Sequence, residues 1–517
     1  GAAFSMEECK KAHYALPYFH GLRRESLGCL EMSSQPLEQS LVHLSEALNE
    51  EALDIHDKIW AYSTATAFRA DLAATVVQKG LQEPQVRDEV YCQLMVMATG
   101  NPIQRSVDAV WKLLCACAVT FPPSALLARH VCHFCLDRSR APAPSHDYAR
   151  FCLTALEGSL EAGAAYAVAP SVEEMAAYDL RPPVLAKISL VDGTPLAETF
   201  PVTPGVDAGK VAEICGRLFL ELRDNRTATF GIFVEAPADA GGGTKSPPPP
   251  RPLARTEYLG DAPAGATFVY KRLALYGDEP TKSEDAAFEH MTFLQAEDAV
   301  VADGSLPVSD ADAAALAAFS VVVCLGDDAP TTVDGLAGLD DGISLVEFFP
   351  PRFARADPRD LAAAVVRKLP DPATPVRVLH RSYVDVAMRQ PLYGAHFFAV
   401  RVDPAHPDQS VKAIEAAAVL PADDAILAIN ARGLSLFHPS DLSTKPLVFV
   451  PFGDVRAWER PDLGFVHVRA RRDDDPDARF VFAAVEPGAD QGITAVLDAY
   501  VRPRQDPPIP RTPRPQN

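Results

Sequence analysis

The chain has 517 residues, of which 48% are hydrophobic and 23% are charged. This length exceeds one ordinary core and predicts three or four domains, and the apolar content is typical of folded globular protein. The net charge of −21 argues against nucleic acid as a partner, because phosphate binding depends on Lys and Arg. No apolar run reaches the roughly 18–20 residues that a membrane span needs.

The cysteines and the first residues indicate the compartment. Eight of the ten cysteines precede residue 153, several inside apolar helical pattern, which favours reduced thiols in a cytosolic protein over a disulfide framework. The chain begins with Gly-Ala-Ala-Phe, which resembles no secretory signal. Because there is no initiating Met, we expect a segment of a longer protein.

Residues 33–165 have helical periodicity throughout. In "VRDEVYCQLMVMATGNP" (86–102), Val86, Val90, Leu94 and Met97 share one helical face, and a second apolar stripe runs beside it. This helix is therefore packed on several sides, and Gly100 can close it. The same pattern predicts further helices at 38–50, 51–79, 106–119, 124–138 and 146–163.

At Val184 the period changes from helical to alternating, which predicts a ubiquitin-like lobe. Asp192-Gly193 between two strand-like runs indicates a hairpin with a type I′ turn. A helix and another strand follow, and residues 266–275 supply the last strand. The Gly- and Pro-rich residues 237–252 cannot build a core and are predicted to be a disordered loop.

Two further blocks follow. Residues 279–392 are helical and Ala-rich, with Ser309 and Asp312 spaced as in a helix cap. Residues 393–503 predict seven short strands and one amphipathic helix, which describes a pleckstrin-homology-like sandwich. The Pro- and Arg-rich residues 504–517 are predicted to be a disordered tail.

No catalytic signature is found in the sequence. "GVDAGK" (205–210) lacks the glycine spacing of a phosphate-binding loop, and Val211 stands where a magnesium ligand is needed. "RHVCHFC" (129–135) offers half of a zinc site without a second Cys/His pair, so a helix core is the preferred interpretation of His130, Cys132, His133 and Cys135. We therefore expect no enzyme activity, no cofactor and no metal.

The segment "LQEPQVRDEVYCQLMVMATGNP…WKLLCACAVTFPPSALL" resembles the myosin tail homology 4 domain. The remainder, including "PLYGAHFF", "LAINARGLSLFHP" and "PFGDVRAW", resembles a FERM domain. The resemblance implies a multidomain α plus α+β fold, in which a helical bundle precedes a three-lobed FERM cloverleaf. Its expected parts are a bundle at 1–165, a ubiquitin-like first lobe at 180–278, an acyl-CoA-binding-protein-like helical second lobe at 279–392 and a pleckstrin-homology-like third lobe at 393–503.

This tandem is found in the tails of unconventional myosins and of a plant-type kinesin, so the resemblance implies a cytoplasmic, cytoskeleton-associated motor-protein tail. The first expectation is a myosin tail that binds cargo or adaptor peptides, or the motor's own head in autoinhibition. The alternatives are a kinesin tail that binds microtubules or actin, and a phosphoinositide-dependent membrane adaptor. The acidic helical block, with a charge of −5 over residues 1–165, argues against microtubules.

Two sets of site residues follow. The expected peptide site is a groove between the "DVRAW" strand and the last helix, because an exposed strand edge can accept an added strand. Its expected residues are Asp454, Val455, Arg456, Ala457, Trp458, Ile493, Val496 and Tyr500, although the helix residues could equally be sandwich core. Phosphoinositide head groups would contact Arg469, Arg471, Arg472 and Arg479, whose potential is diluted by the neighbouring Asp473, Asp474 and Asp475.

For Arg87, Asp88 and Glu89, structural roles at the start of a buried helix are preferred over partner contact.

Overall fold

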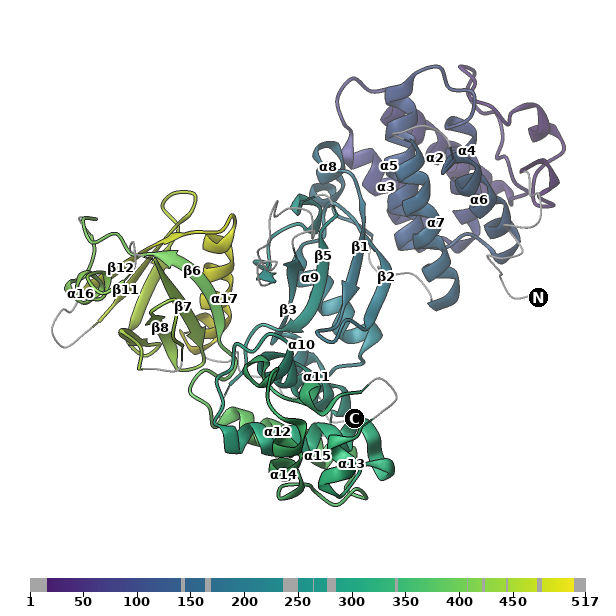
Figure 1. Ribbon diagram of the computed structural model, residues 1–517. Coiled ribbons are helices and arrows are strands. Elements are labelled where there is room, and N and C mark those ends of the chain that lie inside the picture. Colours follow the sequence, from purple (N-terminus) through teal and green to yellow (C-terminus); the bar gives the residue numbers. More distant parts are fainter. Residues whose placement is uncertain are drawn as a thin grey trace, which may run out of the picture. The chain divides into compact units, whose positions relative to one another are not determined.

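The computed structural model describes residues 16–140, 145–162, 169–235, 250–263, 265–276, 285–339, 343–406, 408–420, 424–442, 445–471 and 477–505. The chain divides into two compact units. Unit 1 comprises Gly1–Ile188, Ala197–Asp207 and Tyr258–Ala264, and unit 2 comprises Ser189–Leu196, Ala208–Glu257 and Gly265–Asn517. Figure 1 labels the elements of both units.

Unit 1 is built around a helical bundle. Its helices are α2 (Glu46–Thr64), α3 (Ala70–Gln82), α4 (Arg87–Met97), α5 (Gln104–Thr120), α6 (Ala125–Arg138), α7 (Ser145–Ala162) and α8 (Val172–Leu180). Helix α4 is buried from residue 89 to residue 97, as its two apolar stripes predict. The sequence prediction of this helix is therefore confirmed.

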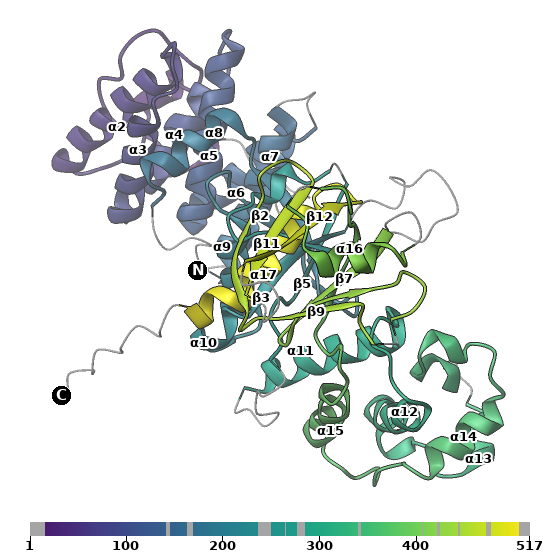
Figure 2. The same cartoon turned by 90° about the vertical axis from the view of Figure 1, so that its left-hand side faces the viewer.

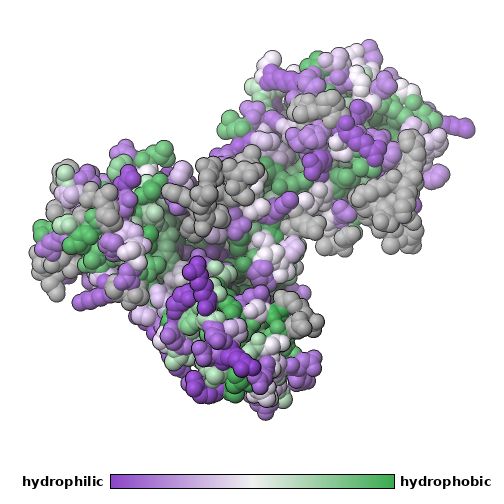
Figure 3. Space-filling model, viewed as in Figure 1, coloured by the Kyte–Doolittle hydropathy of each residue, from purple (hydrophilic) through white to green (hydrophobic). Residues whose placement is uncertain are grey.

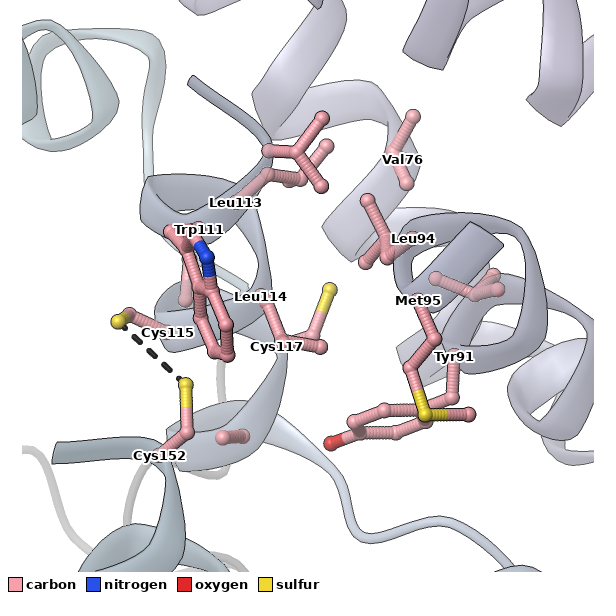
Figure 4. Packing of buried hydrophobic residues seen from close by; sticks show 14 of the residues in the cluster. Val76, Tyr91, Leu94, Met95, Trp111, Leu113, Leu114, Cys115, Cys117 and Cys152 are labelled. Carbon is pink, nitrogen blue, oxygen red and sulfur yellow. Dashed lines mark hydrogen bonds between the residues drawn. The ribbon is translucent and has the colours of Figure 1, made fainter. Parts of the chain in front are cut away.

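The core of the bundle lies between α4, α5 and α7. Tyr91 and Leu94 of α4 and Trp111 and Leu114 of α5 are at most 1% exposed (Figure 4). The Tyr91 hydroxyl donates to the Phe121 carbonyl at 2.8 Å, which satisfies the buried phenol.

The predicted boundaries of the first two helices of the bundle are wrong. Helix α2 begins at Glu46 and ends at Thr64, so residues 38–45 are not helical and the predicted helix at 51–79 is two helices. Residue 42 instead forms an isolated antiparallel bridge with Leu22, and the amides of residues 41 and 42 both donate to the buried carboxylate of Glu89, at 2.9 Å and 2.8 Å.

Helix α8 extends the bundle past residue 165, where we expected it to end. Met175 and Tyr178 of α8 are buried in the same core cluster as α4 and α5. A capping box starts the helix: the Ser171 hydroxyl accepts from the Glu174 amide at 3.1 Å, and the Glu174 carboxylate accepts from the Ser171 amide at 2.7 Å. The helical core therefore includes residues beyond the expected boundary.

The first sheet has five strands in the order β2-β1-β5-β3-β4. They are β1 (Val184–Ser189), β2 (Pro195–Val202), β3 (Phe230–Glu235), β4 (Arg251–Pro252) and β5 (Thr267–Arg272), with helix α9 (Ala208–Ile214) between β2 and β3. In unit 2, β3 is antiparallel to both of its neighbours, with Ile232 opposite Tyr270 and Phe233 opposite Pro252. The predicted order of two strands, a helix and two further strands is confirmed, with β4 added.

Two details of this lobe differ from the prediction. The Asp192-Gly193 hairpin turn forms, but among the described residues Gly193 has positive φ (80°) and Asp192 does not. A type I′ turn needs positive φ at both positions, so the predicted turn type is wrong. The predicted loop 237–252 falls largely outside the described residues, and its end, Arg251–Pro252, is strand β4 rather than loop.

The helical part of unit 2 follows the first sheet. It comprises α11 (Ala286–Glu297), α12 (Asp310–Leu325), α13 (Val333–Ala337), α14 (Pro358–Val366) and α15 (Val376–Met388), and a short α10 (Asp224–Thr227) precedes β3. The predicted cap of α12 is confirmed, because the Ser309 hydroxyl accepts from the Asp312 amide at 3.1 Å. The expected tail at 504–517 lies almost wholly outside the described residues.

The second sheet has seven antiparallel strands in the order β10-β11-β12-β6-β7-β8-β9. These are β6 (His396–Arg401), β7 (Asp424–Asn430), β8 (Gly433–Phe437), β9 (Val448–Pro451), β10 (Val455–Glu459), β11 (Phe465–Ala470) and β12 (Ala478–Ala484). Helix α17 (Ala489–Gln505) packs on this sheet (Figure 2), and a short α16 (Val411–Ala417) was not predicted. The expected fold class, multidomain α plus α+β with a helical bundle before the two sheets and their helical parts, is confirmed.

Candidate partner-binding site

Strand β10 ends the second sheet and carries the predicted peptide-binding edge. It pairs with β11, with Ala457 opposite Arg469 and Trp458 opposite Val468, and the register shifts at Arg456. This bulge interrupts the edge, so residues 457–459 form its regular stretch. Because β10 is the terminal strand of the sheet, no strand of the described residues pairs with one backbone edge of this stretch.

Trp458 connects this edge to helix α17. Its indole Nε1 donates to the Asp498 carboxylate at 3.0 Å, and its half-buried ring packs against the sandwich core. Asp498 was not among the predicted site residues. Asp498 and Thr494 are polar residues four positions apart, so they lie on the same, less buried face of α17. This polar face could have been read from the sequence. The Trp458–Asp498 hydrogen bond therefore links the β10 edge to helix α17.

The predicted helix residues do not line a groove. Ile493, Val496 and Tyr500 are each 0% exposed, and Val455 of β10 is 2% exposed. All four belong to the core cluster of the sandwich. The prediction is corrected for these residues, because the apolar face of α17 covers the sheet and cannot also receive a partner's side chain.

Tyr500 has further contacts that fix it in place. Its hydroxyl accepts from the Leu275 amide at 3.0 Å and donates to the Gly394 carbonyl at 3.2 Å. Burial is the main cause that raises the pKa of this phenol, so it stays protonated. Of the predicted peptide-site residues, Asp454, Arg456, Ala457 and Trp458 remain partly or fully exposed.

The predicted basic patch is partly neutralised. Arg469 and Arg479 are opposite one another on β11 and β12, and Arg469 and Arg471 are exposed. The Arg479 guanidinium, however, lies 3.0 Å from the Asp408 carboxylate and 3.7 Å from that of Asp477. Arg472 and the three expected acidic neighbours, residues 473–475, lie outside the described residues.

Arg87, Asp88 and Glu89 have the structural roles that we preferred. Arg87 donates to the carbonyls of Gly80 and Leu81 at the end of α3, at 2.8 Å and 3.1 Å. The Asp88 carboxylate accepts from the amide and the hydroxyl of Ser124, the residue that caps α6. Glu89 holds residues 41 and 42.

The two candidate ligand motifs lie in structural settings. The amides of Ala208 and Gly209 donate to the carbonyls of Glu257 and Arg255, at 2.7 Å and 2.8 Å, so they are not available to a phosphate. Cys132 and Cys135 are buried in α6, where His130 packs edge-on against Phe19. Nowhere in the described part of the chain do three or more His, Cys, Asp or Glu gather as a metal site.

One face of the molecule mixes polar and apolar residues. On the face seen in Figure 3, hydrophilic and hydrophobic residues are intermixed. Among the helices of the described residues, none combines the length and the apolar content needed to cross a bilayer.

One family match lies within the helical bundle. Residues 73–177, from within α3 to within α8, match the family described as MyTH4 domain. Unconventional myosin-VIIb of Mus musculus is 32% identical over 118 residues, which are 21% of this chain and 6% of that protein. The Myosin-I heavy chain of Dictyostelium discoideum is 29% identical over 165 residues, 30% of this chain and 7% of that protein.

The likeness to another relative extends past the bundle. The kinesin-like protein KIN-14I of Oryza sativa subsp. japonica is 24% identical over 459 residues, 80% of this chain and 34% of that protein. This chain therefore spans about a third of KIN-14I and less than a tenth of the two myosins.

Two solved structures resemble the chain over most of its length. The Dictyostelium discoideum Myosin VII MyTH4-FERM MF2 domain has 15% identity and a TM-score of 0.48, with 92% of both chains covered. The human Myosin 7b C-terminal MyTH4-FERM domain, solved in complex with the harmonin-a PDZ3 domain, has 18% identity and a TM-score of 0.46, with 94% of this chain and 96% of that chain covered. From the family match and the helices that occupy it, we conclude that this chain carries a MyTH4 domain at residues 73–177.

Proposed function

We propose that this chain is the partner-binding tail of an unconventional myosin, with a FERM domain at residues 180–503 behind its MyTH4 domain. The MyTH4 match and the two myosin relatives support this origin, while KIN-14I keeps a kinesin as the alternative. The proposed activity is binding without chemical change of the partner.

The proposed peptide site is the edge of β10 at residues 457–459. The observation that carries it is the terminal position of β10 in the sheet, next to the Trp458–Asp498 hydrogen bond of 3.0 Å. An extended peptide would add a strand to this edge through backbone hydrogen bonds. The half-buried Trp458 ring would supply the apolar contact, since aromatic side chains dominate the energy of such interfaces.

The test starts from a 12-residue peptide selected by display against the whole chain. We expect Trp458→Ala to raise its Kd at least tenfold, and bound peptide to slow amide hydrogen exchange at residues 456–459. The matched control is Val485→Ala, because Val485 is 46% exposed and lies on another strand end. Equal affinity for Trp458→Ala and wild type, with no protection at β10, would remove this site.

The occupant of this edge could also be the motor's own head. An ATPase assay on an isolated head fragment, with this chain added, distinguishes a partner peptide from the head as the occupant. In autoinhibition, the wild-type chain lowers the ATPase rate of the head, and Trp458→Ala relieves this inhibition. An unchanged ATPase rate in the presence of the wild-type chain restricts the proposal to cargo and adaptor peptides.

A further inference from the structure

A cavity lies at the opposite edge of the seven-stranded sheet from β10, within unit 2. We name it the β8–β9 pocket. It has a volume of about 680 Å³ and is lined by residues 307–309 before α12, residues 390–392 after α15, and side chains of β8, β9 and their flanking loops. Its volume falls within the roughly 300–1,000 Å³ that is typical of ligand pockets.

The sheet supplies the apolar side of the pocket. Ser435 of β8 is opposite Phe449 of β9, so these side chains share one face with Phe437. This face is opposite to the one that Leu436 and Val448 direct into the sandwich core. Phe449 is 41% exposed, although aromatic side chains of this size are usually covered. The pocket therefore includes an aromatic side chain that is partly exposed to solvent.

The charged side chains that line the pocket are cationic. Among the described lining residues, Arg432 and Lys445 are charged and none is acidic, although the Asp312 carboxylate lies behind the wall, bound by Ser309 and Gln390. Both cations are exposed, and neither forms an ion pair with another residue that the structure describes. Their field is thus available to an anionic ligand.

Hydrogen bonds fix the backbone next to Arg432 and the opposite side of the pocket. The Asn430 amide nitrogen donates to the Pro391 carbonyl at 2.9 Å, and the Asn430 side-chain oxygen accepts from the Arg432 amide at 3.0 Å. On the side of α12, the Ser309 hydroxyl and the Gln390 amide both donate to the Asp312 carboxylate, at 2.8 Å and 3.2 Å. This part of the pocket wall is therefore held by hydrogen bonds before any ligand arrives, which lowers the entropic cost of binding.

We propose that the β8–β9 pocket binds a peptide segment in which Asp or Glu lies close to a large apolar residue. The carboxylate would pair with Arg432 and Lys445, and the apolar side chain would cover Phe449. A peptide fits better than a compact metabolite because β9 is the terminal strand of the sheet, and the exposed Leu447, two residues before Phe449, continues the apolar surface along it. This site is at the opposite edge from β10 and does not depend on the function proposed above.

The test is a display selection of random 12-residue peptides on the whole chain, with counter-selection on the double variant Arg432→Glu/Lys445→Glu. We expect enriched peptides to combine an acidic and a large apolar residue, and the double variant to raise their Kd at least tenfold. Ser435→Trp, which fills the pocket and leaves the charge unchanged, should do the same. If charge reversal impairs folding, Ser435→Trp alone tests whether the selected peptides bind in the pocket.

Arg367→Glu is the matched control, because Arg367 is an exposed arginine of unit 2 that belongs to neither proposed site. Loss of binding in Arg456→Glu and Trp458→Ala, with full binding in the two pocket variants, would overturn this proposal and support the β10 site. Selection of no acidic peptide would also overturn it. The proposal fails as well if the charge reversal lowers binding to phosphatidylcholine vesicles containing phosphatidylinositol 4,5-bisphosphate but leaves the affinity for the selected peptides unchanged.

Discussion

The phenol oxygen of Tyr500 lies 3.0 Å from the amide nitrogen of Leu275, which is 225 residues earlier in the chain. The same oxygen donates to the carbonyl of Gly394 at 3.2 Å. Helix α17 thus joins the chain that leaves the first sheet to the chain that enters the second. The ring packs edge-on against Tyr276 and stacks on Phe452, each at 5.6 Å between centroids. Tyr500 is therefore a structural connection within unit 2.

Tyr500→Phe should destabilise unit 2 and leave the β10 site intact. The substitution leaves the buried Leu275 amide without its acceptor, at a cost of about 1–3 kcal/mol. Urea unfolding followed by tyrosine and tryptophan fluorescence measures this loss. Tyr18→Phe is the control, because Tyr18 is 72% exposed and the change should stay within about 0.5 kcal/mol. Equal unfolding midpoints for the two variants would contradict the assigned role.

The same helix shows what periodicity can and cannot predict. The spacing of Ile493, Val496 and Tyr500 correctly indicated an amphipathic helix, but an apolar helix face has the same spacing whether it covers a core or lines a groove. The choice depends on what packs against the face. Here the sheet covers it, and that information lies in residues far away in sequence.

Three further features of the structure were missed in the sequence, each for its own physical reason. Helices α2 and α3 are separated at residues 65–69, which contain neither Gly nor Pro, so no local signal marked the break. Helix α8, in contrast, could have been found, since Ser171 followed three residues later by Glu174 is a readable capping box. The β8–β9 pocket could not be found at all, because it gathers side chains from residues 307 to 449.

Glu89→Gln should destabilise the bundle. The carboxylate accepts from the amides of Leu41 and Val42 and from the Gln93 side chain, at 2.8–2.9 Å. A glutamine has one acceptor oxygen, so its NH₂ group would face a backbone donor inside the core. We expect a loss of about 2 kcal/mol in the free energy of unfolding.

The measurement is thermal unfolding followed by circular dichroism at 222 nm. Glu38→Gln is the matched control, because Glu38 is exposed and lies on the same chain segment. Glu89→Gln with a Tm equal to that of Glu38→Gln would show that the clamp on residues 41 and 42 contributes nothing.

Arg381→Ala should destabilise unit 2 more than Arg377→Ala. The Glu289 side chain is 2% exposed and pairs with both arginines at 2.8 Å, but the Arg381 side chain is 23% exposed and that of Arg377 is 45% exposed. Solvent therefore screens the Arg377 pair more strongly than the Arg381 pair. A buried carboxylate that has lost its only partner lowers the free energy of unfolding by about 3–5 kcal/mol. Each single variant keeps the other arginine, so the loss should be smaller than this. Urea unfolding of both variants checks the order, and a larger loss for Arg377→Ala would contradict it.

His380 lies in a setting that keeps its imidazole neutral. The side chain of this α15 residue is buried, and its ring stacks on Phe293 with 4.1 Å between centroids. Burial, followed by the neighbouring His290, lowers the pKa of His380 to about 4, while Glu289 acts in the opposite direction. In the unfolded chain the imidazole has a pKa of about 6.5. Between these two values the unfolded chain binds a proton that the folded chain does not.

The stability that depends on neutral His380 is therefore complete above pH 6.5 and is lost as the pH falls toward 4. At pH 5 we expect a loss of about 1–2 kcal/mol relative to pH 7, and His380→Phe should abolish this part of the pH dependence while preserving the stack on Phe293. Urea unfolding at pH 7 and pH 5 measures the difference for wild type and variant. His20→Phe, at an exposed position, should retain the wild-type pH dependence. If His380→Phe and His20→Phe lose equal stability between pH 7 and pH 5, the burial of His380 does not control the acid response, and other titrating groups must account for it.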